Sequence, residues 1–121
     1  MIISIASDHA GFEQKQLLAA YLEGKGYEVH DLGPDSDDRV DYPDFAAKVA
    51  HEVAGGVATY GVLVCGTGIG MAVAANKING IRAVNVINTQ FAELCREHND
   101  ANILCLGERT VGPGLAMRIV D

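Results

Sequence analysis

Disulfides, metal sites and membrane spans have little support in this sequence. Its 121 residues include only three cysteines, Cys65, Cys95 and Cys105, none with the C-x-x-C or Cys/His spacing of a metal site. An odd number of cysteines without such spacing favours a reducing, cytoplasmic setting. No apolar run reaches the roughly 18 residues that cross a bilayer, and Met1 leads into a strand-like stretch without the basic region of a signal peptide. We expect a soluble protein with no membrane partner and no metal.

Basic residues are also few, nine against sixteen acidic ones, and the net charge is −7. They are scattered singly and do not form the stripe that binds nucleic-acid phosphates, so no nucleic-acid partner is expected. A small anion could still bind where a few basic groups and backbone amides converge against the overall negative field.

Three familiar phosphate- and nucleotide-binding motifs are missing. A cysteine phosphatase loop needs an arginine six residues after its cysteine, and that position after Cys65 is Met71. A Walker loop needs Gly-Lys-Ser/Thr, where this chain has Gly70-Met71-Ala72. The turn after the first expected strand reads Ser-Asp-His-Ala-Gly and not G-x-G-x-x-G, which argues against a dinucleotide. We expect no cofactor.

Short β-rich segments alternate with helical ones along the whole chain, and 49% of the residues are hydrophobic and 21% charged, as in a globular domain. Because each parallel crossover uses a helix, the alternation predicts an α/β fold, a three-layer α/β/α sandwich around a five-stranded parallel Rossmann-like sheet, whose strand order stays open. We predict one domain over residues 1–121. The expected strands are 2–7, 27–32, 60–65, 82–87 and 103–106, and the expected helices are 11–23, 43–54, 70–77, 89–98 and a last one opening at 112–114.

One helical stripe carries a candidate side chain. Phe91, Leu94, Cys95 and His98 share a face of the helix expected at 89–98. Such spacing is typical of a face that packs on a core. The pattern therefore predicts that His98 follows this face inward.

In open parallel sheets, ligands bind beyond the carboxyl ends of the strands. Three segments follow strands here: Ser7-Asp8-His9, Cys65 to Gly70, and Gly107-Glu108-Arg109. His98-Asn99-Asp100 follows the fourth helix. We expect a thiol, a histidine and an acid to converge on one edge of the sheet.

The segment Cys65-Gly66-Thr67-Gly68-Ile69-Gly70 is the most informative. Its alternate glycines can turn several N–H groups inward ahead of a helix and make an anion cradle, although a tight turn that only packs helix on strand has the same pattern. A thiol facing such amides should have a depressed pKa and act as base or nucleophile. A lone cysteine at the end of a strand is more often a small buried hydrophobe, and this is how we interpret Cys95 and Cys105.

The remaining candidates each have a structural alternative. His98 ends a helix, where the dipole favours its cation, but a packing or capping role is commoner. Asp8 and His9 place a carboxylate beside an imidazole, and Asp8 could instead cap the following helix. His30 and His51 have no partner near them in the sequence, so no role is assigned to them.

Together these segments resemble ribose-5-phosphate isomerase of type B, the family shared with allose- and galactose-6-phosphate isomerases. The resemblance runs in register from Ile3 to Asp121. Its motifs are SDHAGF (7–12), DYPDFA (41–46), CGTGIGMAVAANK (65–77), GIRA (80–83), REHNDANIL (96–104) and GERTVG (107–112). The combination of Cys65 with His98-Asn99-Asp100 is similar to the ribose-5-phosphate branch that uses a cysteine base.

The resemblance implies an aldose–ketose isomerase that interconverts ribose 5-phosphate and ribulose 5-phosphate. Cys65 would move a proton between C1 and C2 through an enediolate, with Thr67 assisting transfer between the two oxygens. His98, helped by the Asp8 region, would open the furanose ring. The implied catalytic residues are Cys65, Thr67, His98 and Asp8, and the implied substrate-binding residues are His9, Tyr42, Gly66, Gly68, Ile69, Gly70, Asn99 and Arg109.

The family is dimeric or tetrameric with sites built between subunits, so the resemblance implies a homodimer or homotetramer. Its members usually continue with a further helix and a basic segment whose arginines reach the phosphate, and this sequence ends at Asp121 before them. Two other functions stay open: a sugar-phosphate-binding domain without turnover, and a subunit of a hetero-oligomeric isomerase. The lack of that basic segment favours these alternatives, whereas Cys65, Thr67 and His98 argue against them.

Overall fold

Five parallel strands form the centre of the molecule in the computed structural model, which describes residues 1–36, 38 and 40–120. They are β1 (Ile2–Ser7), β2 (Glu28–Asp31), β3 (Tyr60–Cys65), β4 (Ala83–Asn85) and β5 (Ile103–Gly107). Their order in the sheet is β2-β1-β3-β5-β4, and every neighbouring pair is parallel. The order reverses direction between β1 and β3, so the crevice at their carboxyl ends is where a ligand is expected.

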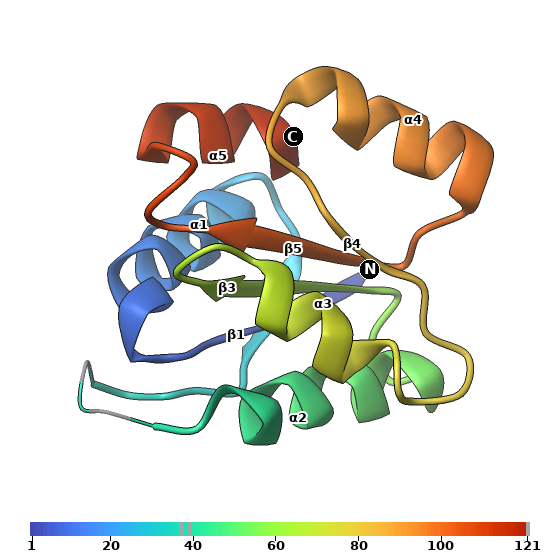
Figure 1. Cartoon of the computed structure of the whole chain (residues 1–121), viewed down its shortest axis with the longest axis horizontal. Coiled ribbons are helices and arrows are strands. Elements are labelled where there is room, and N and C mark those ends of the chain that lie inside the picture. Colours follow the sequence, from blue (N-terminus) through green and yellow to red (C-terminus); the bar gives the residue numbers. More distant parts are fainter. Residues whose placement is uncertain (37, 39, 121) are drawn as a thin grey trace.

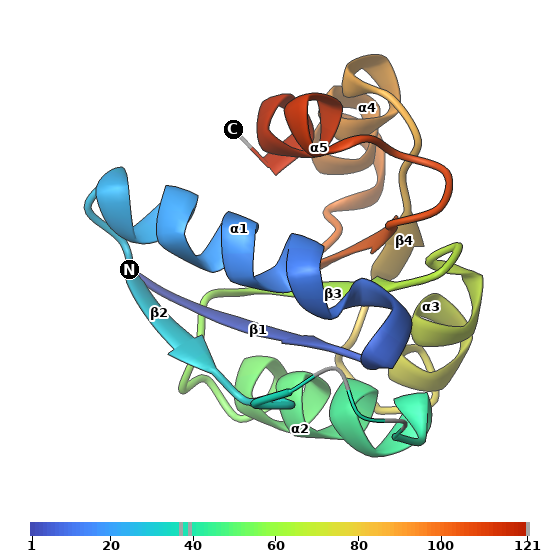
Figure 2. The same ribbon diagram turned by 90° about the vertical axis from the view of Figure 1, so that its left-hand side faces the viewer.

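Helices cover both faces of the sheet. They are the short 3-10 helix η1 (His9–Gly11), α1 (Phe12–Gly24), α2 (Tyr42–Ala54), α3 (Ile69–Ala75), α4 (Thr89–Asn99) and α5 (Pro113–Val120). Helices α1, α4 and α5 lie on one side and α2 and α3 on the other (Figures 1 and 2). The predicted α/β/α sandwich is confirmed. Among the described residues, no helix combines the length and apolarity needed to cross a membrane.

Each face of the sheet has its own hydrophobic core, which is why the central strands are mostly apolar, whereas the edge strand β2 is mostly polar. In β3, Val62 and Val64 pack into the core beneath α1, α4 and α5. Leu63 and Cys65, which alternate with them, pack into the core shared with α2 and α3. The side chain of Cys65 is therefore directed to the layer that contains the helix following its own strand.

The strand boundaries differ from the predictions mainly at the two edges of the sheet. Strand β3, in the centre, spans the predicted residues 60–65, whereas the edge strands β2 and β4 are shorter than the predicted 27–32 and 82–87. An edge strand pairs on one side only, so residues at its ends more easily leave the ladder although their side chains favour β structure. The helix predicted at 11–23 is observed as α1 at 12–24, and the short helix η1 precedes it.

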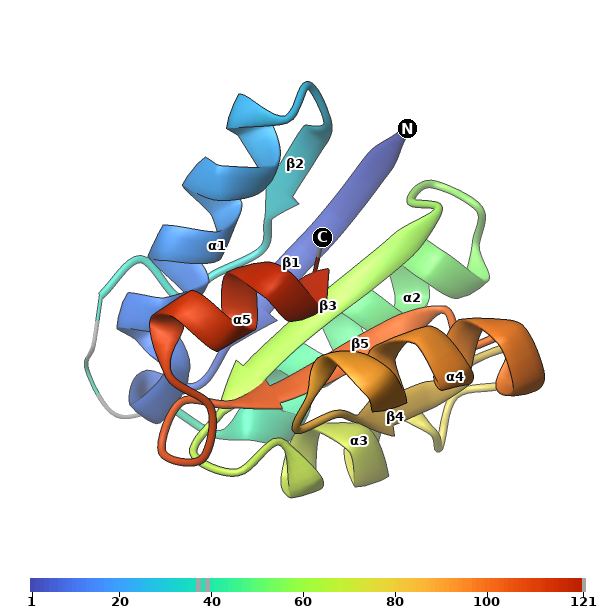
Figure 3. The ribbon, with the colours of Figure 1, turned by 90° about the horizontal axis from the view of Figure 1, so that it is seen from above.

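The prediction for the core face of α4 is wrong for three of its four residues. Phe91 is 49% exposed, Leu94 is 36% exposed and His98 is also exposed, while Cys95 is the buried member of that stripe. Figure 3 shows α4 above β4 and β5, at the outer side of the sheet. Because a helix over an edge strand is covered on part of its circumference only, the apolar stripe of α4 is left on the surface.

Candidate active site

The turn between β3 and α3 folds back over Cys65, the last residue of β3. The N–H of Gly68 donates a hydrogen bond of 3.0 Å to Sγ of Cys65. The N–H of Ile69 donates to the hydroxyl of Thr67 at 3.3 Å. Cys65 is 6% exposed, whereas Thr67 is exposed. The turn therefore places a donor on the thiol and an exposed hydroxyl, which accepts one backbone N–H, close to it in the chain.

Two of the glycines in this turn are required by their surroundings. Gly68 has φ = +87°, in the left-handed region, and a Cβ on it would collide with the side-chain oxygen of Asn85 on β4. A Cβ on Gly70 would lie 3.0 Å from the ring of Tyr42, which begins α2. The alternating glycines thus let a helix and a strand pack closely around the thiol.

The turn after β5 is hydrogen-bonded to the same segment. The N–H of Glu108 donates to the carbonyl of Cys65 at 2.7 Å, and the N–H of Arg109 donates to that of Gly66 at 3.0 Å. The guanidinium of Arg109 lies against Gly66, since a Cβ built there would be 3.3 Å from its terminal nitrogen. This exposed cation therefore lies directly beside the cradle.

Asp8 and His9 reach the site from the end of β1. The N–H of Asp8 donates to the carbonyl of Val64 at 3.1 Å, and its Oδ1 accepts the N–H of Gly11 at 3.0 Å. Asp8 is thus the N-cap of η1, as the capping alternative predicted. Asp8 also borders the site. His9 is exposed, and its Nδ1 lies 3.4 Å from the N–H of Val40.

These segments enclose a pocket of about 260 Å³ at the carboxyl edge of the sheet. Its lining residues are Asp8, His9, Ala10, Tyr42, Cys65, Gly66, Thr67, Gly70 and Arg109. A larger groove of about 640 Å³ lies elsewhere, along Ile3, Tyr60 and Ile119, and contains none of the predicted site residues. We therefore assign the site to the smaller pocket, because the thiol, the cation and the cradle meet there.

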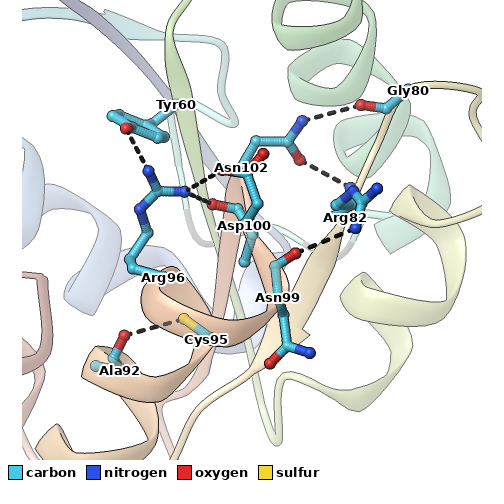
Figure 4. Close-up of polar contacts among 10 residues, drawn as sticks. Tyr60, Gly80, Arg82, Ala92, Cys95, Arg96, Asn99, Asp100 and Asn102 are labelled. Carbon is cyan, nitrogen blue, oxygen red and sulfur yellow. Dashed lines mark hydrogen bonds and ion pairs between the residues drawn. The ribbon is translucent and has the colours of Figure 1, made fainter.

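His98 and Asn99, which the resemblance assigns to the same site as Cys65, lie at the other end of the strands within one chain. Helix α4 runs antiparallel to the strands, and its last turn contacts the edge where strands begin. There Arg96 donates to the hydroxyl of Tyr60, the first residue of β3, at 2.9 Å, and Arg82 donates to the carbonyl of Asn99 at 3.3 Å. Figure 4 shows this network, and Figure 1 shows the end of α4 opposite the arrowheads of β3 and β5.

The surroundings of the three cysteines differ. Burial raises the pKa of Cys105 far above its ordinary value, and the neighbouring Cys65 raises it further. Burial also raises the pKa of Cys95, against a smaller opposing effect of the Arg96 charge. Both are core residues, as predicted. In the described part of the chain, no group of three or more His, Cys, Asp or Glu side chains could hold a metal ion.

Glu108 connects this site to α1, a role that the sequence did not indicate. Its Oε1 accepts the N–H of Gln14 at 2.8 Å, while its own N–H bonds to Cys65. Gln14 in turn donates from its side chain to the carbonyl of Val111 at 2.8 Å. The partners lie more than ninety residues apart in the chain, so no local pattern could have revealed them.

Comparison with known proteins gives consistent matches over almost the whole chain. The family described as ribose/galactose isomerase matches residues 3–121. Ribose-5-phosphate isomerase B of Escherichia coli (strain K12) is 49% identical over 119 residues, 98% of this chain and 80% of that protein. The structure of the Clostridium thermocellum isomerase B is 52% identical, with a TM-score of 0.99 over 100% of this chain and 82% of that one. A Mycoplasma genitalium isomerase B structure with bound ribulose-5-phosphate is 43% identical, with a TM-score of 0.95 over 99% and 80%.

Proposed function

This chain belongs to the ribose/galactose isomerase family, and on that basis we propose that it interconverts ribose 5-phosphate and ribulose 5-phosphate. The relatives named above are ribose-5-phosphate isomerases, and one of their structures holds the ketose product. The reaction is an aldose–ketose isomerisation, in which one proton moves from C2 to C1 and a hydroxyl proton moves from the oxygen on C2 to the oxygen on C1.

Cys65 is the proposed base. Its thiolate would take the proton from C2 of the open-chain aldose, and the electron pair of that C–H bond would form an enediolate. The resulting Cys65 thiol would return the proton to C1, and Thr67 would assist proton exchange between the two oxygens. Such a positioned base contributes roughly 10²–10⁴-fold to the rate.

The observation that most supports this proposal is the hydrogen bond from the Gly68 amide to the sulfur of Cys65, at 3.0 Å. An amide can only donate, so the contact favours a sulfur that accepts. We assign the backbone N–H groups of the segment from Gly66 to Gly70 to the negative charge that would develop on the substrate oxygens. Donors fixed in this way can stabilise an oxyanion by roughly 2.7–4 kcal/mol each.

The rest of the pocket supplies groups for the phosphate and hydroxyls. Arg109 is the cation at the cradle, and its planar guanidinium suits a phosphate. His9 and Asp8 lie on the β1 side of the pocket, and Tyr42 closes it from α2. We assign Arg109 and His9 to the phosphate and hydroxyl groups of the sugar, with Tyr42 as a wall.

His98 and Asn99 would enter the site from a second copy of the chain. Within one copy they lie at the opposite edge of the sheet from Cys65, next to the exposed apolar side chains Phe91 and Leu94 of α4. An interface that covers this stripe would bury apolar surface and could bring His98 of the partner to a neighbouring pocket, where it would open the furanose ring. We therefore propose a homodimer or a higher homo-oligomer, which works in the reducing cytoplasm that the three free cysteines suit.

The experiment that tests the function is direct turnover of ribose 5-phosphate, followed by the appearance of ribulose 5-phosphate. Turnover with saturation kinetics is the expected result. Binding of ribose 5-phosphate without turnover would instead indicate the non-catalytic binding domain, and activity that requires a different, co-purified chain would indicate a hetero-oligomeric subunit.

A further inference from the structure

Lys15 on α1 is almost completely buried, with 1% of its side chain exposed. Its Nζ lies 2.8 Å from both carboxylate oxygens of Asp31, the last residue of β2. It also donates to Oε1 of Gln16 at 2.9 Å and lies 5.1 Å from the ring centroid of Phe12. Burying an ammonium costs several kcal/mol of hydration free energy. The attraction within an ion pair often does no more than offset this cost. Stability alone is therefore a weak reason for this pair.

Asp31 leads from the pair toward the active site. Its Oδ1 also accepts the N–H of Gly33 at 3.0 Å. The carbonyl of Gly33 accepts the N–H of Ser7 at 3.1 Å, and Ser7 immediately precedes Asp8. Lys15, Asp31, Gly33 and Ser7 thus form one continuous chain of polar contacts that ends at the turn carrying Asp8 and His9.

The loop that starts at Gly33 also contacts a residue that lines the pocket. Near its end, the N–H of Val40 lies 3.4 Å from Nδ1 of His9. The chain then enters α2 at Tyr42, whose ring lies against Gly70 in the pocket. Gly33 itself is buried, has φ = +105° and lies under the ring of Phe45. The start of this loop therefore affects the placement of both His9 and Tyr42.

We propose that Lys15 is a positioning residue of the active site. It does not line the pocket. With Asp31 it fixes the start of the 33–41 loop, and through Gly33 it fixes the turn that presents Asp8 and His9. The charge on both partners matters, because charge-assisted hydrogen bonds are shorter and stronger than neutral ones and hold a narrower geometry. The kinetic consequence of this proposal rests on the proposed isomerase function.

The first test is Lys15→Met, which keeps an unbranched chain of similar length and removes the charge. A misplacement of binding groups by about 1 Å can cost on the order of a hundredfold. We expect kcat/KM for ribose 5-phosphate to fall about ten- to a hundredfold at a temperature where the variant remains folded. In the unliganded protein, amide exchange at residues 7–9 and 33–36 should become faster, with no change in α3. Lys77→Met, the same replacement at an exposed lysine, should change neither measurement.

A second variant, Asp31→Asn, keeps an oxygen for the N–H of Gly33 but removes the charge of the pair, and it should give a smaller effect of the same kind. A folded Lys15→Met variant with unchanged kcat/KM and unchanged amide exchange would overturn the proposal. Failure of both variants to fold would also overturn it, because the pair would then serve stability only. If the unmodified chain does not turn over ribose 5-phosphate, the proposed function fails, and amide exchange at residues 7–9 still decides the positioning role.

Discussion

The amide of Gly68 donates to the sulfur of Cys65 at 3.0 Å, three residues after it along the same turn. Gly68 has a positive φ, and the close approach of Asn85 from β4 leaves no room for a side chain at position 68. The thiol is 6% exposed and still borders the pocket with Thr67 and Arg109. An almost buried thiol that faces a fixed donor and borders a pocket supports the proposal that Cys65 is the base.

Alkylation of the native protein should select Cys65. Cys95 and Cys105 have pKa values raised by burial, which suppresses their reactive thiolates near neutral pH. We expect iodoacetamide to label Cys65 at least about tenfold faster than the other two thiols. Peptide mass spectrometry over a time course measures the three rates. Faster labelling of Cys95 or Cys105 would contradict the prediction that Cys65 is the most reactive of the three thiols.

Gly68→Ala should damage both stability and turnover. The substitution places a side chain at φ = +87° and against Asn85, so we expect a loss of more than about 1 kcal/mol in the free energy of unfolding. Turnover of the folded fraction should fall at least about tenfold, because the amide that faces Cys65 must move. Gly24→Ala is the control, since a Cβ there meets no atom within 4 Å. Equal stability and turnover of the two variants would show that the turn adapts without cost.

The sequence predicted the fold from its alternation but not the environment of Lys15. Strand β3 has the predicted bounds because its sequence is mostly apolar, with the strand-favouring residues Tyr60, Val62 and Val64, and a turn lies on each side of it. The partner of Lys15, Asp31, is sixteen residues away on another element, and a single lysine on an amphipathic helix is normally exposed. Tertiary contacts alone decide its burial.

Only part of the candidate site was predicted, again because tertiary contacts decide the rest. The segments after β1, β3 and β5 meet as expected, because the carboxyl ends of parallel strands share an edge. His98 was misplaced because an apolar stripe on a helix has the same spacing whether it covers a core or remains on the surface. Phe91 and Leu94 remain on the surface. His30, to which no role was assigned from its sequence neighbours, has a partner in Glu52, on a different element.

Ser4→Ala should lower stability in a pH-dependent way. The hydroxyl of Ser4 donates to Oε1 of Glu52 at 2.6 Å, and this bond is the main cause of the lowered pKa of Glu52, which His30 lowers further against the effect of burial. A carboxylate with a lowered pKa adds stability above its ordinary value of 4.5, and that stability disappears as pH falls through the lowered value. Urea unfolding should therefore show a deficit of about 1 kcal/mol at pH 7 that shrinks below pH 4.5.

The control is Ser7→Ala in the same strand. Ser7 is also fully buried, but its hydroxyl has no partner within the described part of the chain. It should show no comparable deficit and no change between neutral and acidic pH. A Ser4→Ala deficit that stays constant down to pH 3 would mean that the hydroxyl contributes through packing and not through the ionised Glu52.

Mixing two inactive variants should restore activity if sites are built between copies. In a homodimer, a Cys65→Ser chain paired with a His98→Asn chain contains one site with both residues intact. After unfolding and refolding an equal mixture, we expect about a quarter of the unmodified activity, because about half of the dimers are mixed and each has one working site. Activity no higher than that of the separate variants would mean that Cys65 and His98 of the same copy act in one site, or that His98 takes no part in the reaction.

The most direct measurement of the central claim is the turnover of ribose 5-phosphate by the unmodified chain, by Cys65→Ser and by Cys105→Ser under identical conditions. A hydroxyl is a far weaker base than a thiolate, so Cys65→Ser should lose at least about a hundredfold in kcat. Cys105→Ser, at a buried thiol on the next strand, should keep near-normal kcat in its folded fraction. Near-normal kcat in Cys65→Ser, with a fold that circular dichroism shows to be intact, would contradict the assignment of Cys65 as the base.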